Sequence, residues 1–283
     1  MRHTFLKSKK LNIFTVVAWV WALSFVIAPL CYVVLISFAS RGTYGGIVFD
    51  FSWHNYQKIF DEGLAPLIFS SFIRSVVMAS LTTLFCLFLG FPLAYFLVFK
   101  SGKFRSLLFF LLLIPFWTQF LIRVYAWMSL LSDNGILTSV FGSSWLFTNK
   151  AILVGMVYNY LPYMTLSLYV NLEKLDPLLL DAAADLGASR VMKAVKVILP
   201  LAVPGIVAGS IMVFIPALGE FVIPDILGGS KKYFVGNLLA QQFLNARDWP
   251  FGSALSVILI IVVGFSFLLL SRAMKGKNIE ELL

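Results

Sequence analysis

A carboxylate flanked by helix-breaking residues closes one of the long uncharged runs of this sequence. Glu220 follows the uncharged run 197–219, and Pro216 and Pro224 lie on either side of it. Proline removes a backbone donor and kinks a helix, so opened carbonyl groups are expected beside this carboxylate. Such an arrangement at membrane depth is suited to bind a primary ammonium group, and Glu220 and Asp225 are therefore candidates for the substrate pathway. The alternative is that a helix ends here and leaves Glu220 and Asp225 at the level of the outer lipid headgroups.

Aromatic and amide side chains in the apolar runs are further candidates for contact with a cation. Trp117, Tyr125 and Tyr158 offer ring faces that attract ammonium groups, and Asn159 lies between two tyrosines. Tyrosine and tryptophan also gather at both membrane interfaces, which is the competing explanation for each ring. The same alternatives apply to Trp127, Tyr160 and Tyr163.

Arginine occurs twice within or at the edge of the apolar runs. Arg123 could pair with an acid or position a helix at a gate, or its long side chain could simply reach outward to the membrane interface. We favour this last explanation for Arg123. We expect Arg74 to reach the interface in the same way.

The residues that catalysis or metal binding would need are scarce. The histidines, His3 and His54, lie outside the apolar runs, and Cys31 and Cys86 lie within them. This distribution predicts neither a disulfide framework nor a metal site. The Gly-Lys pairs at 102–103 and 276–277 lack the preceding glycine of a nucleotide-binding loop. We therefore expect no catalytic residue, no metal and no cofactor in this chain.

Long apolar helices are the elements that must position these side chains. Hydrophobic residues make up 60% of the chain and charged residues 12%, whereas about a quarter of a soluble domain is charged. A bilayer core needs about 20 apolar residues of helix, and the runs lack the alternation of barrel strands. We expect an all-α polytopic membrane protein, with 1–283 as a single transmembrane domain. The six expected spans are approximately 13–38, 68–99, 106–131, 150–172, 199–221 and 250–272.

The basic residues predict the orientation of these spans. One side of the membrane would carry Arg2, Lys7, Lys9, Lys10, Lys100, Lys103, Arg105, Lys174, Arg190, Lys193, Lys196, Arg272, Lys275 and Lys277. The other side would carry only Arg41, Lys58, Lys150, Lys231, Lys232 and Arg247. By the positive-inside rule, both termini and the loop 173–198 are expected in the cytoplasm. The net charge of +9 is then explained by basic residues that orient the spans beside membrane lipid, and it does not imply that the chain binds nucleic acid.

The loop 173–198 is a patterned polar island between two apolar runs. Asp176 is expected to cap a helix that has Pro177 at its first position. Leucines then recur at helical spacing on one face, while Asp181 and Asp185 lie one turn apart on another. Gly187 is expected to end this helix, and a second short helix leads to the next span. An ordinary amphipathic loop at the membrane interface would give the same pattern.

The spacing of the island resembles a known family. Asp181-Ala182-Ala183, Gly187, Val197 and Leu199-Pro200 are similar to the EAA loop of permease subunits in binding-protein-dependent ABC importers. Asp181 stands where the family has glutamate, and Val197 stands where it has isoleucine. The resemblance implies a type I importer (MetI-like) permease fold in which this cytoplasmic coupling loop docks on a separate ATP-binding subunit. The implied coupling residues are Asp181, Ala182, Ala183, Asp185, Gly187 and Ala188.

Four further segments resemble the spermidine/putrescine permeases within this family. They are 51–56, 115–123, 219–225 and 245–252. The resemblance implies a subunit of the bacterial inner membrane that passes polyamines by alternating access. It also implies a second homologous permease subunit, a homodimer of the ATPase that binds ATP and magnesium, and an extracytoplasmic polyamine-binding protein.

Alternative functions remain open from the sequence alone. The same machinery with another small solute would show the same island and spans. An ion-coupled secondary transporter would normally show inverted repeats, and the sequence contains no convincing internal repeat.

Overall fold

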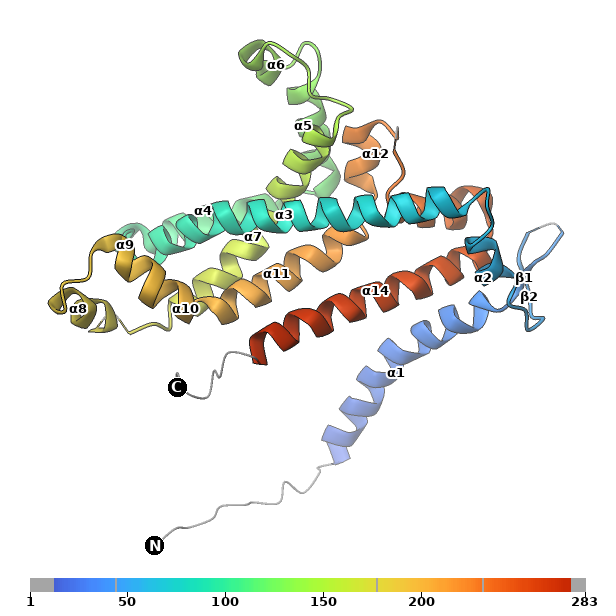
Figure 1. The fold of residues 1–283 in the computed structure, drawn as a ribbon, viewed down its shortest axis with the longest axis horizontal. Coiled ribbons are helices and arrows are strands. Elements are labelled where there is room, and N and C mark those ends of the chain that lie inside the picture. Colours follow the sequence, from blue (N-terminus) through green and yellow to red (C-terminus); the bar gives the residue numbers. More distant parts are fainter. Residues whose placement is uncertain (1–12, 44, 177, 231, 276–283) are drawn as a thin grey trace, which may run out of the picture.

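A computed structural model shows an almost entirely helical chain (Figure 1). The structure describes residues 13–43, 45–176, 178–230 and 232–275; the predictions for Pro177, for Lys231 and for the residues before 13 and after 275 lie outside them. The α-helices are α1 (Ile13–Ser37), α2 (His54–Ile59), α3 (Ala65–Phe99), α4 (Arg105–Trp117), α5 (Phe120–Leu131), α6 (Ile136–Phe141), α7 (Asn149–Leu172), α8 (Leu178–Asp185), α9 (Arg190–Lys193), α10 (Leu199–Leu201), α11 (Val203–Leu218), α12 (Val222–Gly228), α13 (Val235–Ala240) and α14 (Trp249–Lys275). The shorter elements are the strands β1 (Ser40–Arg41) and β2 (Ile47–Val48), the 3-10 turn Gly102–Phe104, and the π-helical turns Ala194–Ile198 and Gln241–Ala246.

The centre of the bundle is formed by α3, α7 and α11, which pack against one another. Small residues allow these helices to approach closely, as is common between helices in membranes. A Cβ atom added at Gly209 of α11 would lie 2.6 Å from the Met164 sulfur, and one at Gly90 of α3 would lie 3.2 Å from Met164 Cγ. Met164 of α7 is fully buried between them.

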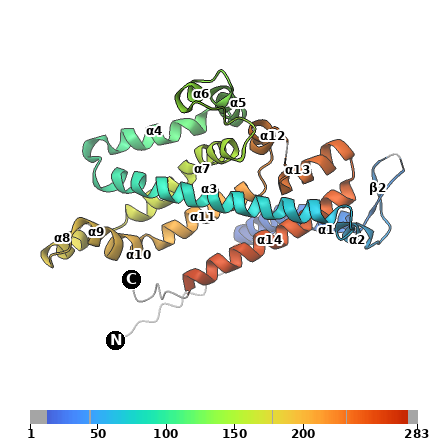
Figure 2. The same ribbon diagram turned by 45° about the horizontal axis from the view of Figure 1, so that its top comes forward.

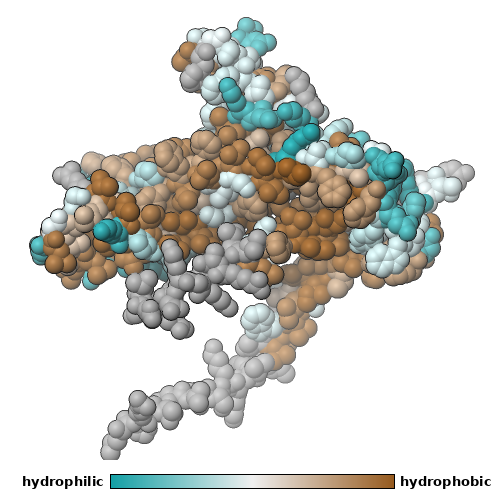
Figure 3. Space-filling view, in the orientation of Figure 1, coloured by the Kyte–Doolittle hydropathy of each residue, from teal (hydrophilic) through white to brown (hydrophobic). Residues whose placement is uncertain are grey.

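The helices include enough apolar length for up to six membrane spans. Within the described residues, α1, α3, α7 and α14 are each long and apolar enough to cross a membrane. Two further candidates are bent pairs: α4 with α5, at 92°, and residues 191–201 with α11, at 65°. Figure 3 shows apolar residues along most of the visible bundle, with hydrophilic residues near the end formed by α2 and around α5 and α6. The prediction of an all-α polytopic fold is confirmed.

Two of the expected spans differ from continuous helices. The expected span 106–131 turns sharply between α4 and α5, and α5 projects from the side of the bundle next to α12 (Figure 1). The expected span 199–221 already ends at Leu218, and a separate helix, α12, starts at Val222. Both interruptions follow an in-helix proline, at Pro115 and Pro216.

The helix α3 is much longer than its neighbour α7. Its 35 residues extend about 52 Å, whereas the 24 residues of α7 extend about 36 Å, at a rise of about 1.5 Å per residue. The first turns of α3 therefore run beyond α7, where they lie beside α2 and α13 (Figures 1 and 2).

An ion pair holds the end of the bundle that contains α2. Lys58 Nζ of α2 lies 3.2 Å from Asp248 Oδ2 and 4.4 Å from the centre of the Phe251 ring. Asp248 also accepts a hydrogen bond from the Phe251 backbone nitrogen at 3.2 Å and so caps α14. The Asp248 carboxylate thus caps the start of α14 and attaches α14 to α2.

Candidate functional site

The polar island starts as the sequence predicts. Asp176 Oδ1 accepts a hydrogen bond from the Leu178 nitrogen at 3.0 Å, and the Asp176 carbonyl accepts one from the Leu179 nitrogen at 3.1 Å. These two contacts satisfy donors of the first turn of α8 that have no partner inside the helix. The predicted capping role of Asp176 is confirmed.

Gly187 ends α8 in the left-handed conformation, with φ of +80°. Its nitrogen donates to the Ala184 carbonyl at 2.8 Å, and the Ala188 nitrogen donates to the Ala183 carbonyl at 3.0 Å. This pair of hydrogen bonds is the Schellman motif, which needs a residue without a Cβ penalty at this position. The predicted helix end at Gly187 is confirmed. It gives the island a rigid corner between α8 and α9.

The island presents apolar and acidic side chains on its exposed face. Leu186 is 89% exposed, and Leu178 and Val191 are also largely exposed. Of the residues predicted to couple to an ATPase, Asp181, Ala182, Asp185 and Gly187 are exposed, and Ala183 and Ala188 are partly buried. An apolar group outside the membrane spans is typical of a surface that a protein partner covers.

A hollow separates the island from the end of α3. Its volume is about 670 Å³, and Tyr95 and Phe99 of α3 face Leu180 and Asp181 of α8 across it. On the same side of the bundle, Arg105 of α4 forms an ion pair of 2.7 Å with Glu173 at the end of α7. The island is therefore held beside the ends of several long helices.

The carboxylate of Glu220 lies in the break between α11 and α12. Its Oε1 atom accepts hydrogen bonds from the backbone nitrogens of Phe221, Val222 and Ile223, at 3.1, 2.9 and 3.4 Å. Its Oε2 atom accepts a hydrogen bond of 2.8 Å from the Tyr160 hydroxyl of α7. Glu220 thus caps the start of α12 and attaches the break to the central helix.

Tyr160 lies halfway along α7. It is about 17 Å from the Asn149 end and about 18 Å from the Leu172 end, at the rise of an α-helix. Because α7 is one of the candidate spans, Glu220 is placed near the middle of that span rather than at its end. The first explanation of this residue, a carboxylate at membrane depth, fits this position better than a headgroup position does.

The break between α4 and α5 has a capping residue of its own. An Arg123 Nη atom donates to the Pro115 carbonyl at 2.5 Å, and the Thr118 hydroxyl donates to the same carbonyl at 2.8 Å. We expected the Arg123 side chain to reach outward to the membrane interface. Instead the guanidinium lies against the end of α4, because the Pro115 carbonyl has no partner in a following helical turn.

Both breaks meet the same stretch of α7 through aromatic rings. Phe116, next to the α4 break, packs edge-on against Tyr163 with 4.9 Å between ring centres. Tyr163 lies 6.2 Å from Tyr160, which bonds Glu220. The carbonyl end of α11 carries partial negative charge and Glu220 adds a full one, whereas Arg123 already neutralises the carbonyl end of α4. This arrangement can bind a cation.

The other predicted pathway residues are dispersed. Trp117 is 80% exposed at the end of α4, and Tyr125 is exposed on α5. Tyr158 packs edge-on against Trp127 at 5.4 Å. Asn159 is buried and donates to the Gly155 carbonyl at 2.8 Å. Within the described residues, no interaction joins these four side chains to Glu220.

Asp225 of α12 contacts the loop that follows α12 and the helix α13. Its Oδ1 atom accepts hydrogen bonds from Ser230 in the loop at 2.8 Å and from Asn237 of α13 at 3.0 Å. Asp225 is exposed, and its predicted place in the substrate pathway stays a prediction. The sequence analysis named Tyr160 only among the rings that could meet a cation and did not predict its contact with Glu220. Its three-residue spacing from Tyr163 places both rings on one helix face.

The comparison with known families matches these features. Residues 86–276 match the family of the binding-protein-dependent transport system inner membrane component. The chain belongs to this family. It is a multi-pass component of a transport system of the bacterial inner membrane, and not an enzyme.

Relatives of this permease extend over nearly its whole length. The spermidine/putrescine transport system permease protein PotB of Escherichia coli (strain K12) is 41% identical over 268 residues, which cover 91% of this chain and 95% of that protein. The fold matches a bacterial alginate ABC transporter in complex with an alginate pentasaccharide-bound periplasmic protein, with a TM-score of 0.72, 16% identity and coverage of 92% of each chain. It also matches the MetNI methionine ABC transporter, with a TM-score of 0.62, 18% identity and coverage of 76% of this chain and 98% of that one.

Proposed function

We propose that this chain is the permease subunit of an ATP-driven importer that moves polyamines such as spermidine and putrescine into the cytoplasm. The relative that is 41% identical over most of the chain carries that substrate in its name. The structural observation that carries the proposal is the Glu220 carboxylate in the break between α11 and α12. Broken helices near the middle of a membrane form the substrate sites of many transporters.

The hydrogen bonds of Glu220 leave room for a cation. Oε1 is occupied by three backbone donors, whereas Oε2 has one partner, the Tyr160 hydroxyl. A carboxylate oxygen has two lone pairs. An ammonium group can therefore bind Oε2 while Oε1 continues to cap α12, so that substrate can pass without unfolding the break. The rings of Tyr160 and Tyr163 add apolar and cation–π surface for the methylene chain and the ammonium groups.

The proposed orientation places both termini and the island in the cytoplasm, following the excess of lysine and arginine on that side. The exposed surface of α8 and the Gly187 corner would then dock on one subunit of a homodimeric ATPase, which binds ATP and magnesium. A second homologous permease subunit would complete the pathway. An extracytoplasmic binding protein would deliver the polyamine.

ATP binding in this scheme closes the ATPase dimer and pushes the island. A rigid corner transmits the push to α9 and α11, and the pathway opens toward the binding protein; hydrolysis resets it. The membrane potential favours entry of a cation by about 2.3 kcal/mol per charge per 100 mV. ATP therefore mainly sets the direction of transport and the gradient that can be reached.

Uptake by the reconstituted complex tests the function. Proteoliposomes would contain this chain, the second permease subunit and the ATPase, and labelled spermidine would be supplied with a panel of binding proteins. We expect uptake only with ATP and a polyamine-binding protein. Uptake driven by a potassium diffusion potential without the ATPase would instead show a secondary transporter. Uptake only with a binding protein for another solute would identify a different substrate.

A further inference from the structure

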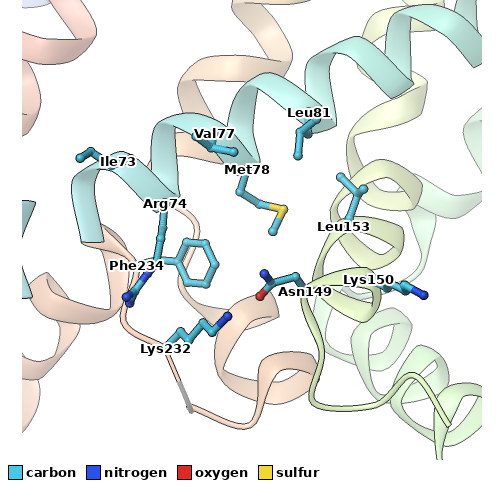
Figure 4. A pocket seen from close by; sticks show the side chains of 10 residues that line it. All are labelled: Ile73, Arg74, Val77, Met78, Leu81, Asn149, Lys150, Leu153, Lys232 and Phe234. Carbon is cyan, nitrogen blue, oxygen red and sulfur yellow. The ribbon is translucent and has the colours of Figure 1, made fainter. Parts of the chain in front are cut away.

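A crevice at the end of the bundle opposite the island combines an apolar wall with basic side chains. It encloses about 300 Å³ between α3 and the start of α7, and Val77, Met78, Leu81 and Leu153 belong to its apolar wall. Figure 4 shows Met78 and Lys232 pointing into this space, with Arg74 and Phe234 beside them. This crevice is separate from the Glu220 site, and the transport mechanism above does not use it.

A second hollow adjoins the crevice and is more polar. Its volume is about 500 Å³, and Ser143, Ser144 and Thr148 contribute to its lining. The two hollows share Asn149, Lys150 and Lys232. A ligand that filled both would have an apolar part along α3 and a polar part among hydroxyl groups, with the lysines at the junction.

The basic side chains of this region have no acidic partner among the described residues. The ion pairs among the described residues lie elsewhere and join Lys58 with Asp248 and Arg105 with Glu173. Arg74, Lys150 and Lys232 are thus available to an anion. The amino end of α7 lies at the same place and adds partial positive charge.

We propose that this crevice binds an anionic phospholipid such as phosphatidylglycerol. The phosphate would lie between Arg74 and Lys232, the polar headgroup would occupy the hollow beside Lys150, and an acyl chain would follow α3 past Val77 and Leu81. The mouth of the crevice faces the bilayer, because Ile73 and Val77 are 63% and 51% exposed on the apolar surface of α3. A soluble acidic protein cannot reach this apolar wall, whereas a lipid lies beside it at high concentration.

Bound lipid would join α3 to α7 and to the loop at Lys232. These segments lie beside the end of α12 and the start of α13, so the lipid would stabilise one arrangement of this end of the bundle. Each basic residue beside the headgroup adds attraction to an anionic lipid. Removal of two is therefore expected to weaken binding by about tenfold or more.

Photo-crosslinking in the assembled transporter tests the proposal. Nanodiscs would contain phosphatidylglycerol or phosphatidylcholine with a photoreactive acyl chain, and crosslinked peptides would be mapped by mass spectrometry. We expect phosphatidylglycerol to label residues 73–81 and 149–153 in preference to phosphatidylcholine, and excess inorganic phosphate not to displace it. The double variant Arg74→Gln/Lys232→Gln should lose this preference. The matched variant Arg41→Gln removes an exposed charge of the β1 strand and should keep it.

A steric variant separates the crevice from general electrostatic attraction. Val77→Trp fills the apolar wall and leaves every charge in place, so labelling should also fall by about tenfold. Equal labelling by both lipids, or unchanged labelling in either variant, would overturn the proposal. Labelling that appears in the isolated chain and disappears in the assembled complex would show that a protein partner covers the crevice, which would also overturn it.

Discussion

The Tyr160 hydroxyl lies 2.8 Å from Glu220 Oε2 and joins the middle of α7 to the break between α11 and α12. The same carboxylate caps α12 through its other oxygen. Glu220 therefore has two roles that different substitutions can separate: it shapes the break, and it provides negative charge there.

Glu220→Gln is expected to lower polyamine uptake by about tenfold while the subunit remains assembled. The amide keeps an acceptor oxygen for the start of α12 but removes the charge, and charge-assisted hydrogen bonds are about twice as strong as neutral ones. Initial uptake rates in proteoliposomes would be measured at limiting and saturating spermidine. Asp225→Asn, on the short helix that Glu220 caps, is the matched control and should transport normally. Normal kinetics for Glu220→Gln at both concentrations would exclude contact with the substrate.

Gly187→Leu is expected to abolish stimulation of the ATPase by loaded binding protein. The residue has φ of +80°, and the left-handed conformation costs a non-glycine residue about 1–2 kcal/mol. Apart from its chain neighbours, no atom in the part of the chain that the structure describes lies within 4 Å of an added Cβ, so any further loss would come from the docking partner. Gly187→Asn tolerates the conformation better and should retain most of the stimulation. Wild-type stimulation in the leucine variant would contradict docking at this corner.

Arg123→Lys is expected to retain transport within about threefold, because one ammonium donor can replace the single contact with the Pro115 carbonyl. Arg123→Met removes that donor and should destabilise the break by about 1 kcal/mol, the usual contribution of a hydrogen bond. Thermal unfolding of the purified complex and uptake would be compared for both variants. Equal losses in the two variants would indicate that the guanidinium has a partner of a different geometry, such as a carboxylate of another subunit.

Gly155→Ala is expected to destabilise the subunit by about 1–3 kcal/mol, the range for overpacking a tight contact. A Cβ atom at this position of α7 would meet Leu227 Cδ1 and would lie 3.1 Å from Ile223 Cγ2, both in α12. Gly264→Ala is the control, since no atom lies within 4 Å of its added Cβ and alanine favours helix. A thermal unfolding midpoint that is unchanged in both variants would show that α12 does not pack tightly on α7.

The sequence predicts the elements that depend on local patterns. Asp176 and Gly187 define α8 because caps and left-handed ends have strong residue preferences. The uncharged runs similarly predict where long helices occur. The orientation of the spans stays a prediction.

The prolines around Glu220 indicated an interrupted helix there, but the sequence did not predict the break after Pro115 or the connections of either break. Pro115 and Pro216 lie inside α4 and α11, and a proline in a membrane helix is compatible with a continuous kinked span. The position of each break depends on a side chain that hydrogen-bonds the backbone groups left without a helical partner. Arg123 donates to a carbonyl, and Glu220 accepts from three backbone nitrogens. Tertiary packing decides whether such hydrogen bonds form. The contact with Tyr160 likewise depends on how α11 lies against α7.

The length of α3 has a mechanical consequence. One helix without a gap runs from the hollow beside the island, at Tyr95 and Phe99, to the turns beyond α7. The helix contains Pro92 near its island end but continues through it. A helix that pivots where it crosses α7 and α11 moves most at its tips, so a small tilt on the shorter arm becomes a larger displacement on the longer one. The α2 loop and the capped start of α14 lie at the far tip. In the proposed mechanism, a push on the island is thus delivered as leverage at the opposite end of the bundle, with the Glu220 break close to the fulcrum, where displacement is smallest.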